Sequence, residues 1–414
     1  MKKAALKIKI VAGVVIALCF VCSGSYAEEN FSMGGSIGAL SINDAMYYRV
    51  ALQPAFKFGK LKVGANLALT WNDTDGIKPW GPEDWANLIL YIQWAEKGDR
   101  PLYFRIGDLQ TATLGHGFIF SRYSNMTQKA YLNAYKNIGV ELDLDFNKAG
   151  VETVFNNILG ITTYGIRPYW RPLKTFNVDI PILSELAIGA TYATDVETGV
   201  FVDTTAVMPE RRVQIYGADL DLPIIARWLI YYVDMGWMVD HGNGWATGFM
   251  GGGPLAEFLS FNYRFEYRNI GADFSPNFFD NYYEMSKPKT VLSSKERYNG
   301  WYGELGFGFF GAVSIMVSYE DSFMNNAKLD GHPWLHGELA FNEKLFSFIK
   351  QRISLSASYD HKNMDQGRPE DQIFEGRFGY GISSNVDIIY AYTQKYTSTG
   401  DPVRTSAIET RLHF

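Results

Sequence analysis

The sequence predicts an all-β fold, a transmembrane antiparallel up-and-down β-barrel of about 18 strands, within a range of roughly 16 to 20. Three observations support this prediction. Apolar and polar residues alternate in many short segments, and aromatic residues make up 15% of the chain. Mean hydropathy is only slightly negative, at −0.11. After the N-terminal segment, no apolar run reaches the length of about 20 residues that a membrane-spanning helix needs. This combination is typical of barrels that cross a membrane with strands.

The clearest strand lies between Leu259 and Arg268, where five apolar or aromatic residues alternate with Ser, Asn, Arg and Glu. Successive side chains of a strand point to opposite faces, so one face is apolar and the other polar. The same pattern recurs in residues 48–58, 61–71, 138–146, 301–309, 313–319, 353–359 and 386–392. Its repetition along the whole chain favours a closed ring of hairpins over a soluble sheet.

Residues 222–239 fit this pattern least well. They are apolar at both alternating sets of positions, apart from Arg227 and Asp234. Continuous apolar runs do not distinguish a strand from a helix by periodicity alone. The segment is therefore interpreted either as strand or as a helix or plug inside the barrel.

The first 27 residues have the order of a cleaved signal peptide. Four lysines precede a short apolar run from Ile10 to Cys22, and Ser25-Tyr26-Ala27 offers a small-x-small cleavage site. The remaining residues, 28–414, are predicted to form one barrel domain. Both cysteines, Cys19 and Cys22, belong to the predicted signal, so the mature domain has no disulfide and no cysteine metal site.

The last nine residues alternate strictly and end on Phe414. Ile408, Thr410 and Leu412 share a face with this phenylalanine. In this feature the chain resembles Gram-negative outer-membrane β-barrel proteins, and in architecture it is porin-like. The resemblance implies that Phe414 is the signal recognised by the barrel assembly machinery. It also implies a location in the outer membrane, among its lipid and lipopolysaccharide, as a monomer or a trimer.

Connections of two lengths alternate along the chain. Short turns are expected at residues 59–60, 147–150 and 383–385, and longer links at residues such as 110–136 and 271–299. Bacterial barrels have short periplasmic turns and long extracellular loops. The short turns and both termini are therefore predicted on the periplasmic side, which requires an even number of strands.

The composition argues against other classes of function. The net charge of −6 gives no basic surface for nucleic acid. The motif Gly34-Gly35-Ser36-Ile37-Gly38 matches a hydrolase nucleophile elbow, but it lies in a predicted strand rather than at a strand-to-helix turn. The six histidines do not have metal-ligand spacing. We therefore expect no enzyme activity, no cofactor and no metal.

The polar faces of the predicted strands carry charges of both signs. Burying such charges dry and unpaired is prohibitive, so the interior must contain water or be extensively paired. This predicts a porin-like channel for passive diffusion of small hydrophilic solutes or ions. The candidates for lining or narrowing the pore are Arg105, Asp108, His116, Arg122, Arg264, Glu266, Arg268, Glu304, Arg377, Glu409 and Arg411.

Residues 110–125 follow the fifth predicted strand and are too apolar for a freely solvated loop. In general porins, the loop after the fifth strand folds inward and narrows the pore. The segment could equally extend the strands above the membrane, and the sequence leaves both interpretations open.

Two other functions stay open. A surface adhesin or structural barrel would use exposed aromatic residues, which residues 271–299 supply in Phe274, Phe278, Phe279, Tyr282 and Tyr283. A transporter of hydrophobic compounds would need an apolar lumen and a plugging segment, and the charged inner face argues against it.

Overall fold

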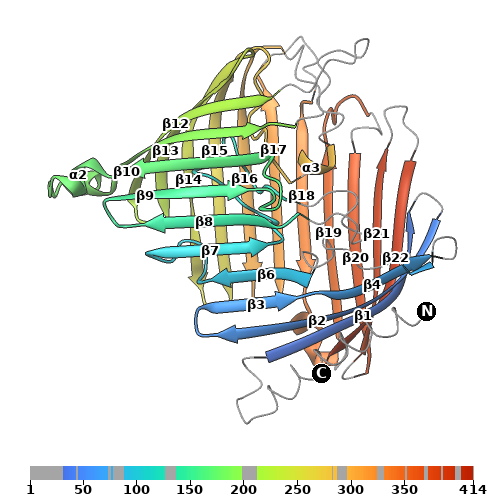
Figure 1. The fold of residues 1–414 in the computed structure, drawn as a ribbon. Helices are drawn as coiled ribbons and strands as arrows, with labels where there is room; N and C mark the ends of the chain where they lie inside the picture. The colour runs from blue at the N-terminus through green and yellow to red at the C-terminus, as the bar shows by residue number, and fades with distance from the viewer. Residues whose placement is uncertain are drawn as a thin grey trace.

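A computed structural model describes residues 31–42, 45–72, 76–77, 88–125, 137–197, 212–281, 283–286, 296–323, 331–349, 352–367, 372–383, 386–396 and 402–413. The predicted signal peptide and Phe414 lie outside these residues, so both stay predictions. The described chain forms one antiparallel sheet of 22 strands. Figure 1 shows how these strands are arranged. No helix among these residues is long and apolar enough to cross a membrane.

The strands are numbered in chain order. The first eleven are β1 (Phe31–Ile42), β2 (Ala45–Phe58), β3 (Leu61–Ala65), β4 (Leu67–Asn72), β5 (Gly76–Ile77), β6 (Ile89–Trp94), β7 (Leu102–Gly107), β8 (Gly139–Asp145), β9 (Ala149–Phe155), β10 (Thr163–Trp170) and β11 (Ala187–Asp195). The others are β12 (Val213–Ile225), β13 (Leu229–Met238), β14 (Asn243–Ala256), β15 (Leu259–Ile270), β16 (Tyr298–Phe309), β17 (Val313–Ser322), β18 (Trp334–Phe341), β19 (Ile353–His361), β20 (Gln372–Ser383), β21 (Val386–Tyr396) and β22 (Pro402–His413).

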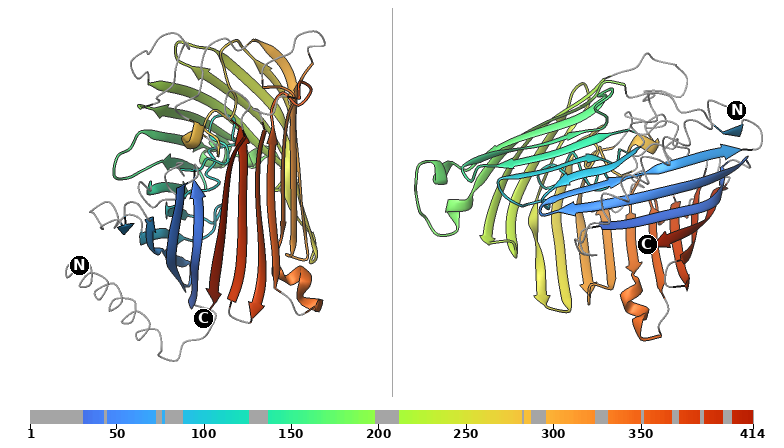
Figure 2. Two further views of the ribbon diagram at one scale, coloured as in Figure 1. Left: turned by 90° about the vertical axis from the view of Figure 1, so that its right-hand side faces the viewer. Right: turned by 60° about the horizontal axis from the view of Figure 1, so that its bottom comes forward.

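The strand pairings form a continuous cycle. β3 and β4 both pair with β2, so they are two parts of one interrupted strand. From β6 onward each strand pairs with the next, and β5 pairs with β4. β22 pairs in turn with β1, from Gly34 opposite His413 to Ser41 opposite Ser406. These two strands lie side by side in Figure 2.

If β3 and β4 are counted as one strand, and β5 is left out because it pairs only with β4, the 22 strands form a cycle of 20. This number is even and lies at the upper end of the predicted range. Residues 222–239 belong to the hairpin of β12 and β13 rather than to a helix or plug.

The two faces of the strands differ as the alternation predicts. On β15, Phe265 and Tyr267 are exposed on the outside, whereas Arg264, Glu266 and Arg268 are buried on the inside. Large exposed apolar side chains recur on the outer face of the other strands, for example Phe249 on β14 and Phe378 on β20. A period of two thus separates an apolar outer surface from a charged inner one.

Most connections on the side where β1 begins are short, at residues 59–60, 146–148, 226–228, 257–258 and 310–312. We call this side the short-turn side. The longest connection on it is residues 171–186, which contain α2 (Pro172–Thr175) and η3 (Leu183–Glu185). η5 (Glu343–Ile349) lies in another long connection on the same side. The alternation of short turns and long connections is therefore less strict than the sequence predicts.

The hydrophobic core lies inside the ring of strands. It is built by residues 108–125, named here the first inner loop, and residues 271–281 with α3 (Tyr283–Ser286), named the second inner loop. Figure 2 shows both within the ring. The core residues are Leu109, Ala112, Leu114, Phe118, Ile119, Phe120, Tyr123, Val154, Ala193, Val213, Ile215, Met238, Ala246, Ile270, Phe274, Phe278, Phe279, Tyr283 and Tyr298. On the wall, most of these are inward-facing positions of β9 and β11–β16.

Candidate functional site: the inner loops and the charged wall

The first inner loop leaves β7, which is the fifth strand of the cycle, and turns back on itself. Ala112 and Tyr123 exchange backbone hydrogen bonds of 3.1 and 2.8 Å. At the base, the Asn125 side chain accepts a hydrogen bond from the Leu109 amide at 2.9 Å and donates to the Gly107 carbonyl at 3.1 Å. Of the two interpretations left open by the sequence, inward folding is the one that the structure shows.

The second inner loop packs against the first. The Phe120 and Phe279 rings stack with centroids 4.4 Å apart, and Phe118 stacks on Phe274 at 5.6 Å. The Asn277 amide donates to the Phe118 carbonyl at 2.8 Å. Aromatic stacking and backbone bonds together join the two loops into one packed unit.

This packing corrects the expectation of an exposed aromatic loop. Phe274, Phe278, Phe279 and Tyr283 are at most 8% exposed, and Tyr282 lies outside the described residues. Sequence alone does not distinguish an aromatic cluster that binds a partner from one that packs in the core. Here the aromatic residues pack against the first inner loop. The predicted exposure of these aromatic residues, which supported an adhesin, is therefore wrong.

His116 anchors the tip of the first inner loop to the wall. Its Nδ1 lies 3.0 Å from Asp234 Oδ1 and its Nε2 lies 3.3 Å from Asp221 Oδ2. The ring stacks on Tyr232 with centroids 4.4 Å apart. Burial lowers the pKa of His116, but the charge of Asp234 and the hydrogen bonds to both carboxylates outweigh it and raise the pKa to about 10. The tip is therefore held as an imidazolium between two carboxylates.

The glycine before this histidine contacts a second charged group. The Gly115 amide donates to Glu152 Oε2 at 2.7 Å. Arg167 pairs with Glu152 at 3.2 Å and donates two hydrogen bonds to Asp219, of 2.9 and 2.6 Å. A Cβ on Gly115 would lie 2.8 Å from Arg167 Nε, and the φ of +55° also favours glycine. The close approach of tip and wall therefore requires this residue.

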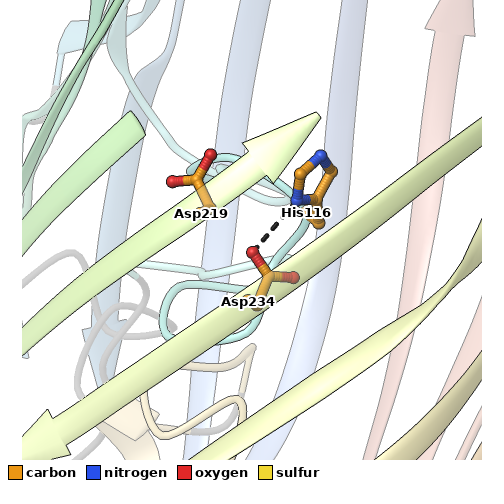
Figure 3. A group of neighbouring side chains, drawn as sticks. All are labelled: His116, Asp219 and Asp234. Carbon is orange, nitrogen blue, oxygen red and sulfur yellow. Dashed lines mark hydrogen bonds and ion pairs between the residues drawn. The ribbon is translucent and has the colours of Figure 1, made fainter. Parts of the chain in front are cut away.

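His116, Asp219 and Asp234 place ligand atoms within 4.8 Å of one another, which invites a test for a cation site (Figure 3). Asp234 Oδ2 is buried and has no hydrogen-bond partner among the described residues. However, both Asp219 oxygens already accept from Arg167, and both ring nitrogens of His116 face carboxylates. Metal ligation requires a neutral imidazole with a free nitrogen, so these residues fit an ion-pair clamp rather than a metal.

Arg264, Glu266 and Arg268 form a buried network on β15. Arg268 lies 2.6 Å from Glu266 and 2.6 Å from Glu320, and Arg264 also pairs with Glu266. Tyr232 donates to Glu266 at 2.7 Å and Tyr298 donates to Glu320 at 2.8 Å. These three pore candidates are thus closed off from solvent, and here the interior is extensively paired rather than wet. Tyr232 also stacks on His116, which joins the network to the loop tip.

The other predicted residues are placed individually. Arg105 is half-buried at the base of the first inner loop, where it donates to the Asp108 carbonyl at 2.8 Å and to Gln93 at 2.7 Å. Arg122, on the returning half of that loop, lies 3.7 Å from Glu338 on β18.

Glu304 accepts from Tyr302 at 2.9 Å. Arg377 is exposed on the inner face of β20. Glu409 and Arg411 lie in β22, and their side chains are outside the described part.

Sequence reasoning missed the acidic wall that holds the loop tip. Its acidic residues are Glu152, Asp219, Asp221 and Asp234. Arg167 lies among them and pairs with Glu152 and Asp219. One signal was present, because Asp219-Leu220-Asp221-Leu222 alternates as an inward-facing strand does. The segment that follows is apolar at both sets of positions, which obscures this signal.

Comparison with solved structures gives matches of low similarity. OccK11 (OpdR) from Pseudomonas aeruginosa aligns with a TM-score of 0.41 and 9% identity over 93% of this chain and 95% of that one. OccAB3 from Acinetobacter baumannii gives 0.37 and 10% identity over 93% and 98%. OpdK from Pseudomonas aeruginosa, solved with vanillate, gives 0.38 and 8% identity over 93% and 97%. No protein-family model matches the chain, and no curated protein matches it in sequence.

Proposed function

We propose that the chain is an outer-membrane channel for passive diffusion of small hydrophilic solutes or ions, and that the two inner loops narrow its water path. The cycle of 20 strand pairings, with apolar residues outside and charges of both signs inside, suits a bilayer around it and water within it. This is a transport function rather than catalysis. We further propose that the short turns lie at the periplasmic face and that Phe414 is the assembly signal.

The observation that carries the proposal is the unequal filling of the interior. The inner face of β12–β15 is covered by the inner loops, and there Arg268 is 0% exposed. On the opposite part of the ring, Arg377 on β20 and Ser354 on β19 face inward and are exposed. We infer that solutes pass beside β19–β22, between this open wall and the first inner loop.

Arg122 lies at the border between the filled and the open part. Its side chain is 36% exposed, and its partner Glu338 is 45% exposed. A fixed charge beside a narrow water path controls the local potential and thus the passage of ions. Arg122 is therefore the residue of the first inner loop at which selectivity is best tested.

Planar-bilayer recording of the refolded barrel tests both parts of the proposal. Arg122→Glu should shift the reversal potential in a salt gradient toward cations, because two carboxylates then face the path. Lys148→Glu is the matched control, since it makes the same charge change in the exposed turn between β8 and β9. If the wild type gives no discrete steps of current, the proposed channel function is wrong. An equal shift in both variants would show that Arg122 is not at the narrow point.

Of the alternatives, a transporter of hydrophobic compounds gains the plugging segment that it requires. The apolar side chains of the inner loops nevertheless bury one another, with Phe120 and Phe279 at 0% exposure. They offer a packed core rather than an apolar lining. The charged and exposed residues of the open wall favour hydrophilic solutes.

A further inference from the structure

The connection between β10 and β11, residues 171–186, projects from the short-turn side beyond the ends of β9 and β10 (Figure 1). All of residues 176–183 are exposed. Their bulky apolar members are Phe176, Val178, Ile180, Ile182 and Leu183. Asp179 is the single charge among the eight. Contiguous apolar surface of this kind marks a contact with a lipid or a partner rather than with water.

Several polar groups at the two ends of this connection bond within it or to the adjoining turn. Lys174 pairs with Glu185 at 2.6 Å. Arg171 makes a two-point ion pair with Asp145 at the end of β8, at 2.9 and 3.1 Å. The Trp170 indole donates to Thr175 Oγ1 at 2.8 Å. The connection is therefore an organised loop that presents an apolar surface.

Neighbouring turns on the same side carry exposed aromatic residues. Phe58, Phe146, Phe258 and Phe310 each lie within or beside a short turn, and all four are exposed. Aromatic residues gather at the level where a membrane barrel meets the edge of the bilayer. The apolar outer surface thus extends to the turns, and residues 176–183 continue it beyond the strand ends.

We propose that residues 176–183 form an interfacial anchor that inserts into the lipid leaflet at the short-turn side. This inference rests on the proposed function, because it requires the strands to span the bilayer. The occupant is lipid rather than a protein, since the apolar surface is continuous with the outer face of the barrel and the phenylalanine-bearing turns. A second copy of the chain on the same surface is the competing outcome.

Site-specific labelling tests the anchor. The two cysteines of the sequence precede residue 28, so a chain expressed from residue 28 has no native thiol. Ile180→Cys is labelled with an environment-sensitive fluorophore and reconstituted in vesicles, with or without brominated acyl chains. Phe265→Cys, on the outer face of β15, is the lipid reference. Asp99→Cys, in the exposed turn between β6 and β7, is the aqueous control on the same side.

The anchor predicts blue-shifted emission at position 180 and quenching by brominated lipid comparable with that at position 265, with neither effect at position 99. Quenching at 265 but not at 180 would overturn the anchor and leave the barrel intact. A blue shift at 180 without lipid quenching, lost on dilution of the protein in the vesicles, would assign the surface to a second copy and overturn the lipid contact. No quenching at 265 would overturn the spanning barrel and the anchor with it.

Discussion

Arg268 on β15 and Arg377 on β20 occupy equivalent places in the alternating pattern, yet their surroundings differ completely. Arg268 is fully buried, pairs with Glu266 and Glu320, and lies 4.3 Å from the centroid of the Tyr302 ring. Arg377 is exposed. The inner face of one barrel therefore carries charges with two roles. Paired charges on the filled side hold the inner loops, whereas Arg377 on the open side is exposed to the proposed water path.

The largest expected effect comes from removing one partner of the buried network. Arg268→Ala takes away the arginine that Glu266 and Glu320 share, so Glu266 keeps only Arg264 and Glu320 loses its arginine partner. Breaking a buried ion pair in this way costs about 3–5 kcal/mol of folding free energy. Arg377→Ala removes the same side chain from the open wall, so its cost should be small. Urea titration of the barrels in lipid vesicles measures both. Similar losses of stability would remove the distinction between the two sides.

The second effect tests the face assignment on the open side alone. Phe378→Arg places a charge on the outer face of β20, and near the bilayer midplane such a change costs about 2–4 kcal/mol. Ser354→Arg, on the inward face of the neighbouring β19, adds the same side chain to a wet wall. The same titration should separate the two variants clearly. A greater loss of stability for Ser354→Arg would mean that the inward and outward faces of these strands are the reverse of this assignment.

The smallest effect concerns the pH dependence of the loop clamp on the filled side. The folded-state pKa of His116 is about 10, above its ordinary 6.5. The contribution of the imidazolium is therefore fully present below about 6.5 and is lost as the pH rises through about 10. Channel conductance should become noisier in this alkaline range as the loop tip loosens. His116→Gln, which has no titrating group, should lack that step; an identical response in both would exclude His116 as its origin.

The barrel could be predicted from the sequence because a strand has a period of two and this period is local. Leu259 to Arg268 shows both faces without any knowledge of the rest of the chain. Strand number was harder, since β12 and β13 contain apolar runs that also suit a helix. The position of the first inner loop after the fifth strand depends on a count of strands, and it left inward folding and extension of the strands equally open.

The site could be predicted only in part, because its contacts join distant segments. His116 and Asp234 are separated by 118 residues, and nothing near either one specifies the other. Phe279 likewise gives no local sign that it will stack on Phe120. Inward-facing charge was recognisable from alternation, but whether a residue is paired, as Arg268 is, or exposed, as Arg377 is, depends on where two loops pack.

The pairing of β1 with β22 has a consequence for the order of folding. Hairpins such as β14–β15 need only a two-residue turn and can form as soon as both strands exist. The junction of Ile37 with Thr410 must wait until the two ends of the chain meet, and contacts of such long sequence separation form slowly. Until then both edges expose unpaired backbone. In pulsed hydrogen exchange during refolding, the amides of this seam should be the last to gain protection.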